Sequence, residues 1–186
     1  MVKEQGAQKY LHCANSIEDH KNINEDNMDE KLVSAMRTGN MELAKQAIAD
    51  NPEAVHLADE RGFTPLVLAT YLEQVGIARL LLEKGAEVNR QDAAGNTALM
   101  GVVFKGHEEL VDLLLEHGAE IDKQNHSGAT ALIFAATYGK LSMAKKLLEH
   151  GAATTIKDAE GRSAQEHADE QGHRALSKLL KEHSQS

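Results

Sequence analysis

The chain has 186 residues, a formal net charge of −9 and 41% hydrophobic residues. This length corresponds to one domain. The acidic charge argues against nucleic acid as a partner, because phosphate binding needs a basic surface. No apolar run approaches 18 residues, so we expect no membrane partner. The amino terminus lacks an apolar signal core and Cys13 is the only cysteine, which together favour a cytoplasmic protein without a disulfide.

Residues 1–27 do not follow the pattern of the rest of the chain. They carry three lysines against five carboxylates, and only Tyr10, Leu11 and Ile17 are candidate apolar anchors. We predict a flexible acidic leader. The alternative is a segment that folds against the first repeat or against a partner.

Residues 28–58 have the pattern of two short helices. Asp29 is a candidate N-cap for the first helix, and Gly39 suits its end. A second helix is expected over residues 41–49, and Pro52 stops it. We assign this segment to an amino-terminal capping repeat.

A 33-residue unit then recurs without drift. Gly62, Gly95 and Gly128 are 33 residues apart, and each opens a Gly-x-Thr-x-Leu phrase that Gly161 repeats in a degraded form. A second phrase, Leu-Leu-Glu-x-Gly-Ala, recurs at the same step. A fixed period of this length indicates stacked copies of one small unit, which is a solenoid. We place the copies at residues 59–91, 92–124 and 125–157, with a carboxy-terminal capping repeat at 158–186.

Each copy predicts two helices and a turn. A threonine or serine precedes an apolar helical run as its N-cap, and a glycine 11 residues after the opening glycine suits the helix end. The second helix has apolar residues at helical spacing and also ends at glycine. The fold class is therefore an all-α repeat solenoid. The predicted caps are Thr64, Thr97, Thr130 and Ser163, and the closing glycines of the first helices are Gly106, Gly139 and Gly172.

Glu73 takes the place of that closing glycine in the first full copy. A glutamate in a left-handed conformation is strained. We therefore expect this turn to differ, with the helix continuing toward Gly76.

These phrases resemble the ankyrin repeat, a β-turn followed by two antiparallel helices that opens with Gly-x-Thr-Pro-Leu-His. The resemblance covers residues 29–184. The usual histidine is replaced by Val67, Met100, Ile133 and Glu166, so a hydrogen bond that commonly ties the turns together should be missing. The resemblance implies a monomeric, non-enzymatic protein without cofactor or metal. It would bind another protein through turn tips and the concave side of the first helices, as an inhibitor, adaptor or accessory subunit.

Three of the six aromatic residues fall on one stripe of that concave side. In such a repeat the last two residues of the first helix face it, and these include Tyr71, Leu72, Phe104, Lys105 and Tyr138. Large exposed aromatic side chains favour a binding surface. The alternative is that the rings pack sideways and only shield the core.

The turn tips add residues to this candidate surface. Phe63 lies at a tip beside the stripe, and Arg61 adds a cation there. With Lys105 and the other rim cations, Arg61 would steer an acidic partner. The other rim cations are Arg90, Lys123 and Lys157.

Two other functions compete with protein binding. His117, His150 and His183 recur at helix ends and suggest a metal-dependent protein, although a cation at a helix end has a structural reason and zinc needs convergent ligands. Leu81 with Asn89, and Leu114 with Asp122, resemble the spacing that ankyrin-directed asparagine hydroxylases accept. That pattern also follows from the repeat itself.

Overall fold

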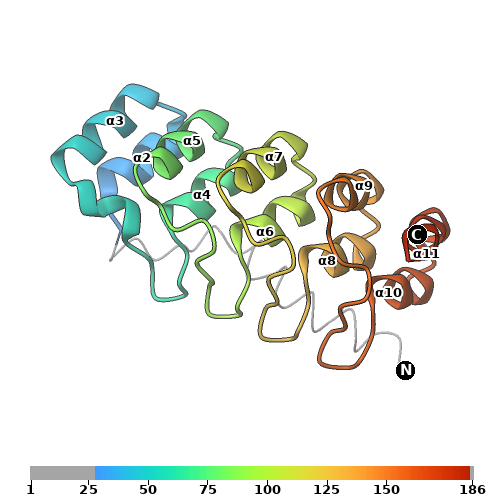
Figure 1. Cartoon of the computed structure of the whole chain (residues 1–186). Coiled ribbons are helices and arrows are strands. Elements are labelled where there is room, and N and C mark those ends of the chain that lie inside the picture. Colours follow the sequence, from blue (N-terminus) through green and yellow to red (C-terminus); the bar gives the residue numbers. More distant parts are fainter. Residues whose placement is uncertain (1–27, 185–186) are drawn as a thin grey trace.

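The computed structural model describes residues 28–184 as an elongated stack of helix pairs, shown in Figure 1. Successive first helices pack on one another in one layer, and successive second helices pack in the other. Residues 28–184 contain ten α-helices and no strand, which confirms the predicted all-α solenoid. The pairs are α2 (Glu30–Thr38) with α3 (Met41–Asp50), α4 (Pro65–Tyr71) with α5 (Val75–Glu83), α6 (Ala98–Lys105) with α7 (Glu108–Glu116), α8 (Ala131–Thr137) with α9 (Leu141–Glu149), and α10 (Ala164–Glu170) with α11 (Arg174–His183).

The first helices begin at the side-chain caps that the sequence predicts. The hydroxyls of Thr64, Thr97 and Thr130 accept from backbone N–H groups three residues later, at 3.2–3.4 Å. Asp29 caps α2 in the same way at 2.9 Å, and Ser163 forms a capping box with Glu166. These bonds satisfy N–H groups that have no partner within the helix. They fix where each first helix starts, and so which residues its last turn presents.

The core runs through the whole stack. Leucines at two repeat positions, one in each helix of a pair, are at most 1% exposed. Burying one leucine side chain contributes about 1.5–3 kcal/mol relative to leaving it in water. Because the same positions are buried in each copy, neighbouring copies complete one another's core. These leucines are Leu66, Leu99 and Leu132 in the first helices and Leu81, Leu114 and Leu147 in the second.

The loops between pairs are organised by one carboxylate or carboxamide per copy. Its Oδ1 accepts from the backbone N–H groups two and four residues later, at 2.8–3.0 Å. A side chain that bonds its own backbone in this way favours a tight turn. Burial raises the pKa of the Asp92 carboxyl above its usual range, although hydrogen bonds from Asn96 and Ala94 act in the opposite direction. The four residues whose Oδ1 organises a turn in this way are Asp59, Asp92, Asn125 and Asp158.

Successive turns stack in direct contact. Gly95 has a φ of 80°, and a Cβ there would lie 2.6 Å from the backbone nitrogen of His126. That nitrogen donates to the Ala94 carbonyl at 3.1 Å. Only glycine combines the left-handed backbone with this close approach.

Side chains also tie the turns together, by bonds that the sequence did not predict. The Gln91 carboxamide donates to the Gln124 carbonyl at 3.0 Å, and Gln124 donates to the Lys157 carbonyl at 3.1 Å. Asn125 donates to the Asn96 side chain at 2.8 Å. These amides therefore link neighbouring copies in the absence of the usual histidine, whose position is occupied by Val67, Met100 and Ile133.

The predicted extension of α4 toward Gly76 is wrong. The helix ends at Tyr71, Glu73 adopts a left-handed φ of 59°, and α5 begins at Val75. The Glu73 carboxylate Oε1 lies 3.1 Å from the His107 Nε2 of the next pair, close enough for an ion pair. The fold of the array therefore imposes the turn, and a glutamate is accommodated where glycine usually stands.

The amino-terminal pair ends as the sequence predicts. α3 ends before Asn51-Pro52, and a short 3-10 helix follows over Pro52–His56. Within residues 28–184, the helices are all too short or too polar to cross a membrane. The predicted leader at 1–27 lies outside the described residues.

Candidate functional site

The aromatic stripe lies where the first helices end. Tyr71 and Phe104 stand in the last turns of α4 and α6, and Tyr138 is the C-cap of α8. All three side chains are half-buried. Because α4, α6 and α8 pack side by side, the stripe crosses three successive copies. The structure therefore brings together the three residues on which the predicted surface depends.

The rings of the stripe also contact one another. Phe104 and Tyr138 meet edge to face, with ring centroids 4.7 Å apart and an interplanar angle of 80°. Tyr138 also lies 6.0 Å from the ring of Phe134, which is fully buried. Such pairs contribute about 0.5–1.5 kcal/mol beyond the area they bury. Sideways packing therefore occurs, as the alternative predicts, but Tyr71, Phe104 and Tyr138 are each still partly exposed.

Cations lie over the rings. The Lys105 ammonium lies 4.2 Å from the centre of the Tyr71 ring, across the boundary between two copies. Lys140 lies 5.9 Å from the centre of the Phe104 ring, across the next boundary. Neither lysine has a carboxylate at ion-pair distance within residues 28–184. The position of Lys140 was not predicted from the sequence. Lys140 directly follows Gly139, the glycine that ends the first helix of its copy. The equivalent residue Gln74 lies against Gly39 of the preceding copy, so the repeat position of Lys140 could have indicated such a contact.

The turn-tip residues behave differently from the stripe. Phe63 is only 2% exposed, so it is a packing residue and not the exposed tip residue that we expected. The half-buried Arg61 covers it, with the guanidinium carbon 4.9 Å from the ring centre. Leu72 is the C-cap of α4 and is half-buried next to Tyr71.

A narrow notch opens beside Tyr71, between α4 and α6. Its half-exposed lining residues are Val67, Tyr71 and Gly101, and Asn96 and Thr97 form part of its floor. It arises at Gly101, because the same repeat position holds Leu68 in the preceding copy and Phe134 in the next. Its space of about 20 Å³ holds one water molecule or a methyl group. The sequence analysis did not identify this notch, although a glycine inside a helical run was a signal for it.

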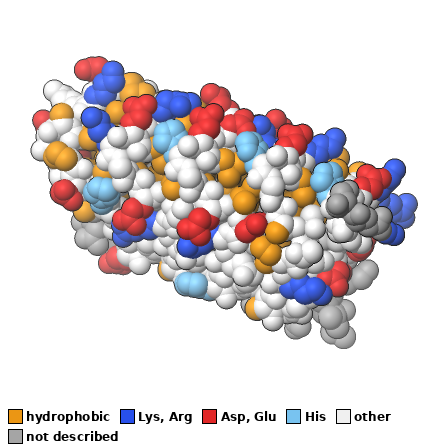
Figure 2. All heavy atoms as spheres, in the orientation of Figure 1, with side chains coloured by type: hydrophobic (Ala, Val, Ile, Leu, Met, Phe, Trp, Pro, Cys, Tyr) orange, Lys and Arg blue, Asp and Glu red, His pale blue; other side chains and the backbone are white. Residues whose placement is uncertain are grey.

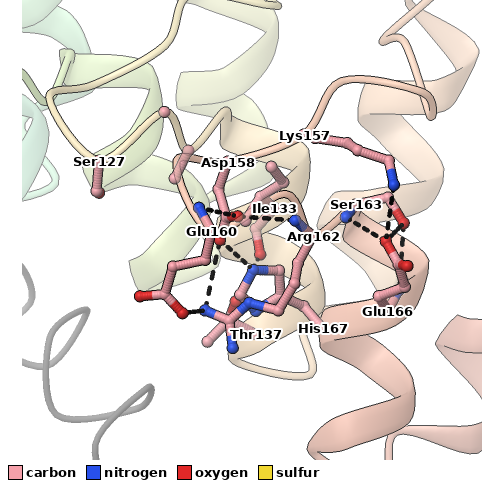
Figure 3. Close-up of polar contacts among 12 residues, drawn as sticks. Ser127, Ile133, Thr137, Lys157, Asp158, Glu160, Arg162, Ser163, Glu166 and His167 are labelled. Atoms are coloured by element: carbon pink, nitrogen blue, oxygen red, sulfur yellow. Dashed lines mark hydrogen bonds and ion pairs between the residues drawn. The ribbon is translucent and has the colours of Figure 1, made fainter.

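A polar cluster closes the carboxy-terminal end of the array (Figure 3). The buried His167 ring lies 2.8 Å from Asp158 Oδ2, and Arg162 lies 2.7 Å from Glu160 and 3.0 Å from Glu170. Within the described residues no further turn follows this one. The cluster therefore supplies polar partners where other turns have a neighbouring copy.

The repeated histidines have structural partners. His117 Nδ1 lies 2.9 Å from the Leu113 carbonyl, and His183 has the equivalent contact with Leu179 at 3.0 Å. His150 lies 3.5 Å from Asp112. No group of three or more metal-ligating side chains converges within residues 28–184. Figure 2 shows histidines recurring along the edge formed by the second helices, among acidic and basic side chains.

Asp112 has a second and closer cationic partner. Its Oδ2 lies 2.7 Å from the Lys146 ammonium, and this hydrogen bond raises the pKa of Lys146. The carboxylate thus links α7 to α9.

The candidate hydroxylation residues join neighbouring copies. The Asn89 carboxamide donates to the Gly118 carbonyl at 3.0 Å and accepts from the Glu120 N–H at 2.8 Å. Asp122 accepts from the Ala153 N–H at 3.0 Å. A modifying enzyme would have to break these bonds before reaching either side chain.

Comparisons with known proteins agree with this architecture. A model of ankyrin repeats matches three times, over residues 3–92, 32–125 and 99–186. The chain is 39% identical over 69 residues to "Ankyrin repeat and SAM domain-containing protein 6" of Rattus norvegicus, which covers 37% of this chain and 8% of that protein. It is 42% identical over 52 residues to "Protein fem-1 homolog A-like" of Mus musculus, and this match covers 28% of this chain and 8% of that protein.

A third relative has a similar short overlap. The chain is 32% identical over 79 residues to "ARF GTPase-activating protein GIT2" of Homo sapiens, covering 42% of this chain and 10% of that protein. The matched segments thus span a tenth or less of these relatives' lengths. Ankyrin repeats are generally modules of protein–protein interaction and not enzymes. The stacked helix pairs and the matches along the whole array show that the chain belongs to the ankyrin-repeat family.

Proposed function

We propose that this protein binds a partner protein on the concave stripe, which we define as Tyr71, Leu72, Phe104, Lys105 and Tyr138, with Arg61 at its edge. The observation that carries this proposal is the alignment of three half-exposed rings across three successive copies. Partly exposed aromatic residues that become buried supply much of the binding energy in many interfaces. Phe63 contributes by packing under Arg61.

The proposed action is to occupy a surface of the partner. The described array has a continuous core and turns that hydrogen-bond to one another, so it presents the stripe on a stiff support, and little ordering is needed on binding. Such a module acts as an inhibitor, an adaptor or an accessory subunit. The cytoplasmic location and the monomeric state stay predictions, which cell fractionation and sedimentation analysis test.

The test is a pull-down from the native source with the full chain. We expect the wild type to capture a partner that the Tyr71→Ala/Phe104→Ala variant loses. The matched control is Leu80→Ala/Leu115→Ala, because these half-buried leucines lie on second helices and their loss also weakens packing. Circular dichroism establishes that each variant is folded. A partner retained by the stripe variant, or lost equally in the control, contradicts the proposal.

A further inference from the structure

The stripe has an electrostatic character opposite to that of the whole chain. The net charge is −9, yet Lys105 and Lys140 cover two of its rings and no carboxylate pairs with either lysine within residues 28–184. The Glu73 carboxylate, two residues after Tyr71, lies beside His107, and the Glu170 carboxylate lies beside Arg162. Two cations that have no carboxylate at ion-pair distance within residues 28–184 attract a negatively charged group.

The notch lies next to one of these cations. Gly101 and Lys105 are four residues apart in α6, so they lie on the same face of the helix, one turn apart. The Lys105 ammonium covers Tyr71, whose ring lines the notch. A small apolar depression and an available cation therefore lie side by side.

We infer that the concave stripe recognises an acidic segment of its partner that carries a methyl-sized apolar side chain, which is that of alanine. The apolar side chain would enter the notch at Gly101, and neighbouring carboxylates would pair with Lys105 and Lys140. Each carboxylate would approach a lysine already held over a ring, so little side-chain entropy is lost on binding. This inference rests on the proposed function and specifies the chemistry of the partner.

The probe is a phage library of random 12-residue peptides, selected against the immobilised full chain. We expect the enriched peptides to have a negative net charge and a recurrent alanine. Fluorescence polarisation with the corresponding synthetic peptides then measures affinity. Binding should weaken at least about tenfold in Lys105→Glu/Lys140→Glu, since both attractive charges become repulsive.

Two further variants make the test specific. Lys145→Glu/Lys181→Glu introduces the same change of net charge at exposed lysines of α9 and α11, and it should keep the wild-type affinity. Gly101→Ala fills the notch with the one methyl group that it can hold, and should weaken binding about as strongly as the charge reversal. Circular dichroism and thermal melting establish that all variants fold.

The outcomes separate this inference from the proposed function. Neutral or basic peptides that bind the wild type and are lost in Tyr71→Ala/Phe104→Ala would overturn the inference and leave the stripe as the binding surface. Peptides whose binding survives both the aromatic and the charge variants would contradict both proposals. An equal loss of binding in the Lys145→Glu/Lys181→Glu control, or no enriched peptide, would also overturn the inference.

Discussion

Glu73 adopts a backbone conformation that glycine has at the corresponding turn of the other four helix pairs. Its φ is 59°, against 64–92° at Gly39, Gly106, Gly139 and Gly172. A residue with a Cβ is destabilised there by about 1–2 kcal/mol. The contact of the Glu73 carboxylate with His107, which is an ion pair only when the imidazole is protonated, contributes at most about 1 kcal/mol, because an exposed pair is screened by water. The turn is therefore retained by the packing of the array and not by the local preference of Glu73.

Replacing Glu73 by glycine tests this balance. We expect Glu73→Gly to raise the free energy of unfolding by up to about 1 kcal/mol, because the relief of strain exceeds the lost ion pair. Gly106→Ala, at a φ of 92°, should lower it by about 1 kcal/mol. Urea denaturation measures the free energy of unfolding of both variants. A loss of more than ~1 kcal/mol in Glu73→Gly would mean that the pair with His107 outweighs the strain.

The Glu166 carboxylate gives a residue-level prediction of pH dependence. Hydrogen bonds from the Ser163 backbone and hydroxyl hold the pKa of Glu166 below its usual value. A lowered pKa in the folded state contributes stability above the unfolded pKa, and this contribution is lost as the pH falls through the folded pKa. Because the side chain is 51% exposed, the contribution is less than about 1 kcal/mol.

The comparison is between wild type and Glu166→Gln, melted at neutral pH and in strong acid. We expect the wild type to be slightly more stable at neutral pH, and the difference to vanish in acid once Glu166 is protonated. A difference that is the same at both pH values would show that the charge of Glu166 does not contribute to the cap.

Helix pairs depend on the leucines that neighbouring copies bury together. Leu114 in α7 is 0% exposed, and the adjacent Leu115 is half-buried. We expect Leu114→Ala to lower the free energy of unfolding by about 2–5 kcal/mol, and Leu115→Ala to lower it by less, because less apolar surface is lost. Chemical denaturation provides the measurement. A loss below ~1 kcal/mol for Leu114→Ala would contradict its place in the core.

The carboxy-terminal helix pair depends on a polar cluster as well as on leucines. The Asp158 side chain is fully buried, and it accepts from the backbone of Glu160 and Arg162 and contacts His167. Asp158→Ala would leave these buried groups without their acceptor, at a cost of about 3–5 kcal/mol. In a linear array this loss should open α10 and α11 before the rest.

Amide hydrogen exchange measures how readily each helix of the array opens. In Asp158→Ala we expect amides of α10 and α11 to exchange faster, with those of α4 and α5 close to the wild type. Asp169→Ala is the matched control, since this aspartate is exposed on α10 and its side chain bonds only Ser177 within residues 28–184. Uniformly faster exchange along the array would contradict a local capping role.

At the scale of the whole molecule, the period predicts most of the fold. The four caps at Thr64, Thr97, Thr130 and Ser163 and the left-handed glycines follow from local chemistry that each copy repeats. The turn at Glu73 was mispredicted because packing overrides local preference there. The amide bonds between turns were missed because they join residues about 30 positions apart, which a local pattern does not relate.

The candidate surface was only partly predictable for the same reason. The positions of Tyr71, Phe104 and Tyr138 follow from their place in the repeat. The buried state of Phe63, the position of Lys140 over Phe104 and the notch at Gly101 depend on the contacts between copies. Function at this scale is a property of the stack, since three contacts of the stripe join two copies: Phe104 with Tyr138, Lys105 with Tyr71 and Lys140 with Phe104.

The most direct test of the central claim is hydroxyl-radical footprinting of the full chain, with and without the partner captured in the pull-down. We predict that labelling of Tyr71, Phe104 and Tyr138 falls when the partner binds, while that of Leu80 and Leu115 on the second helices does not change. Protection of Leu80 and Leu115 with unchanged labelling of the three rings would contradict it.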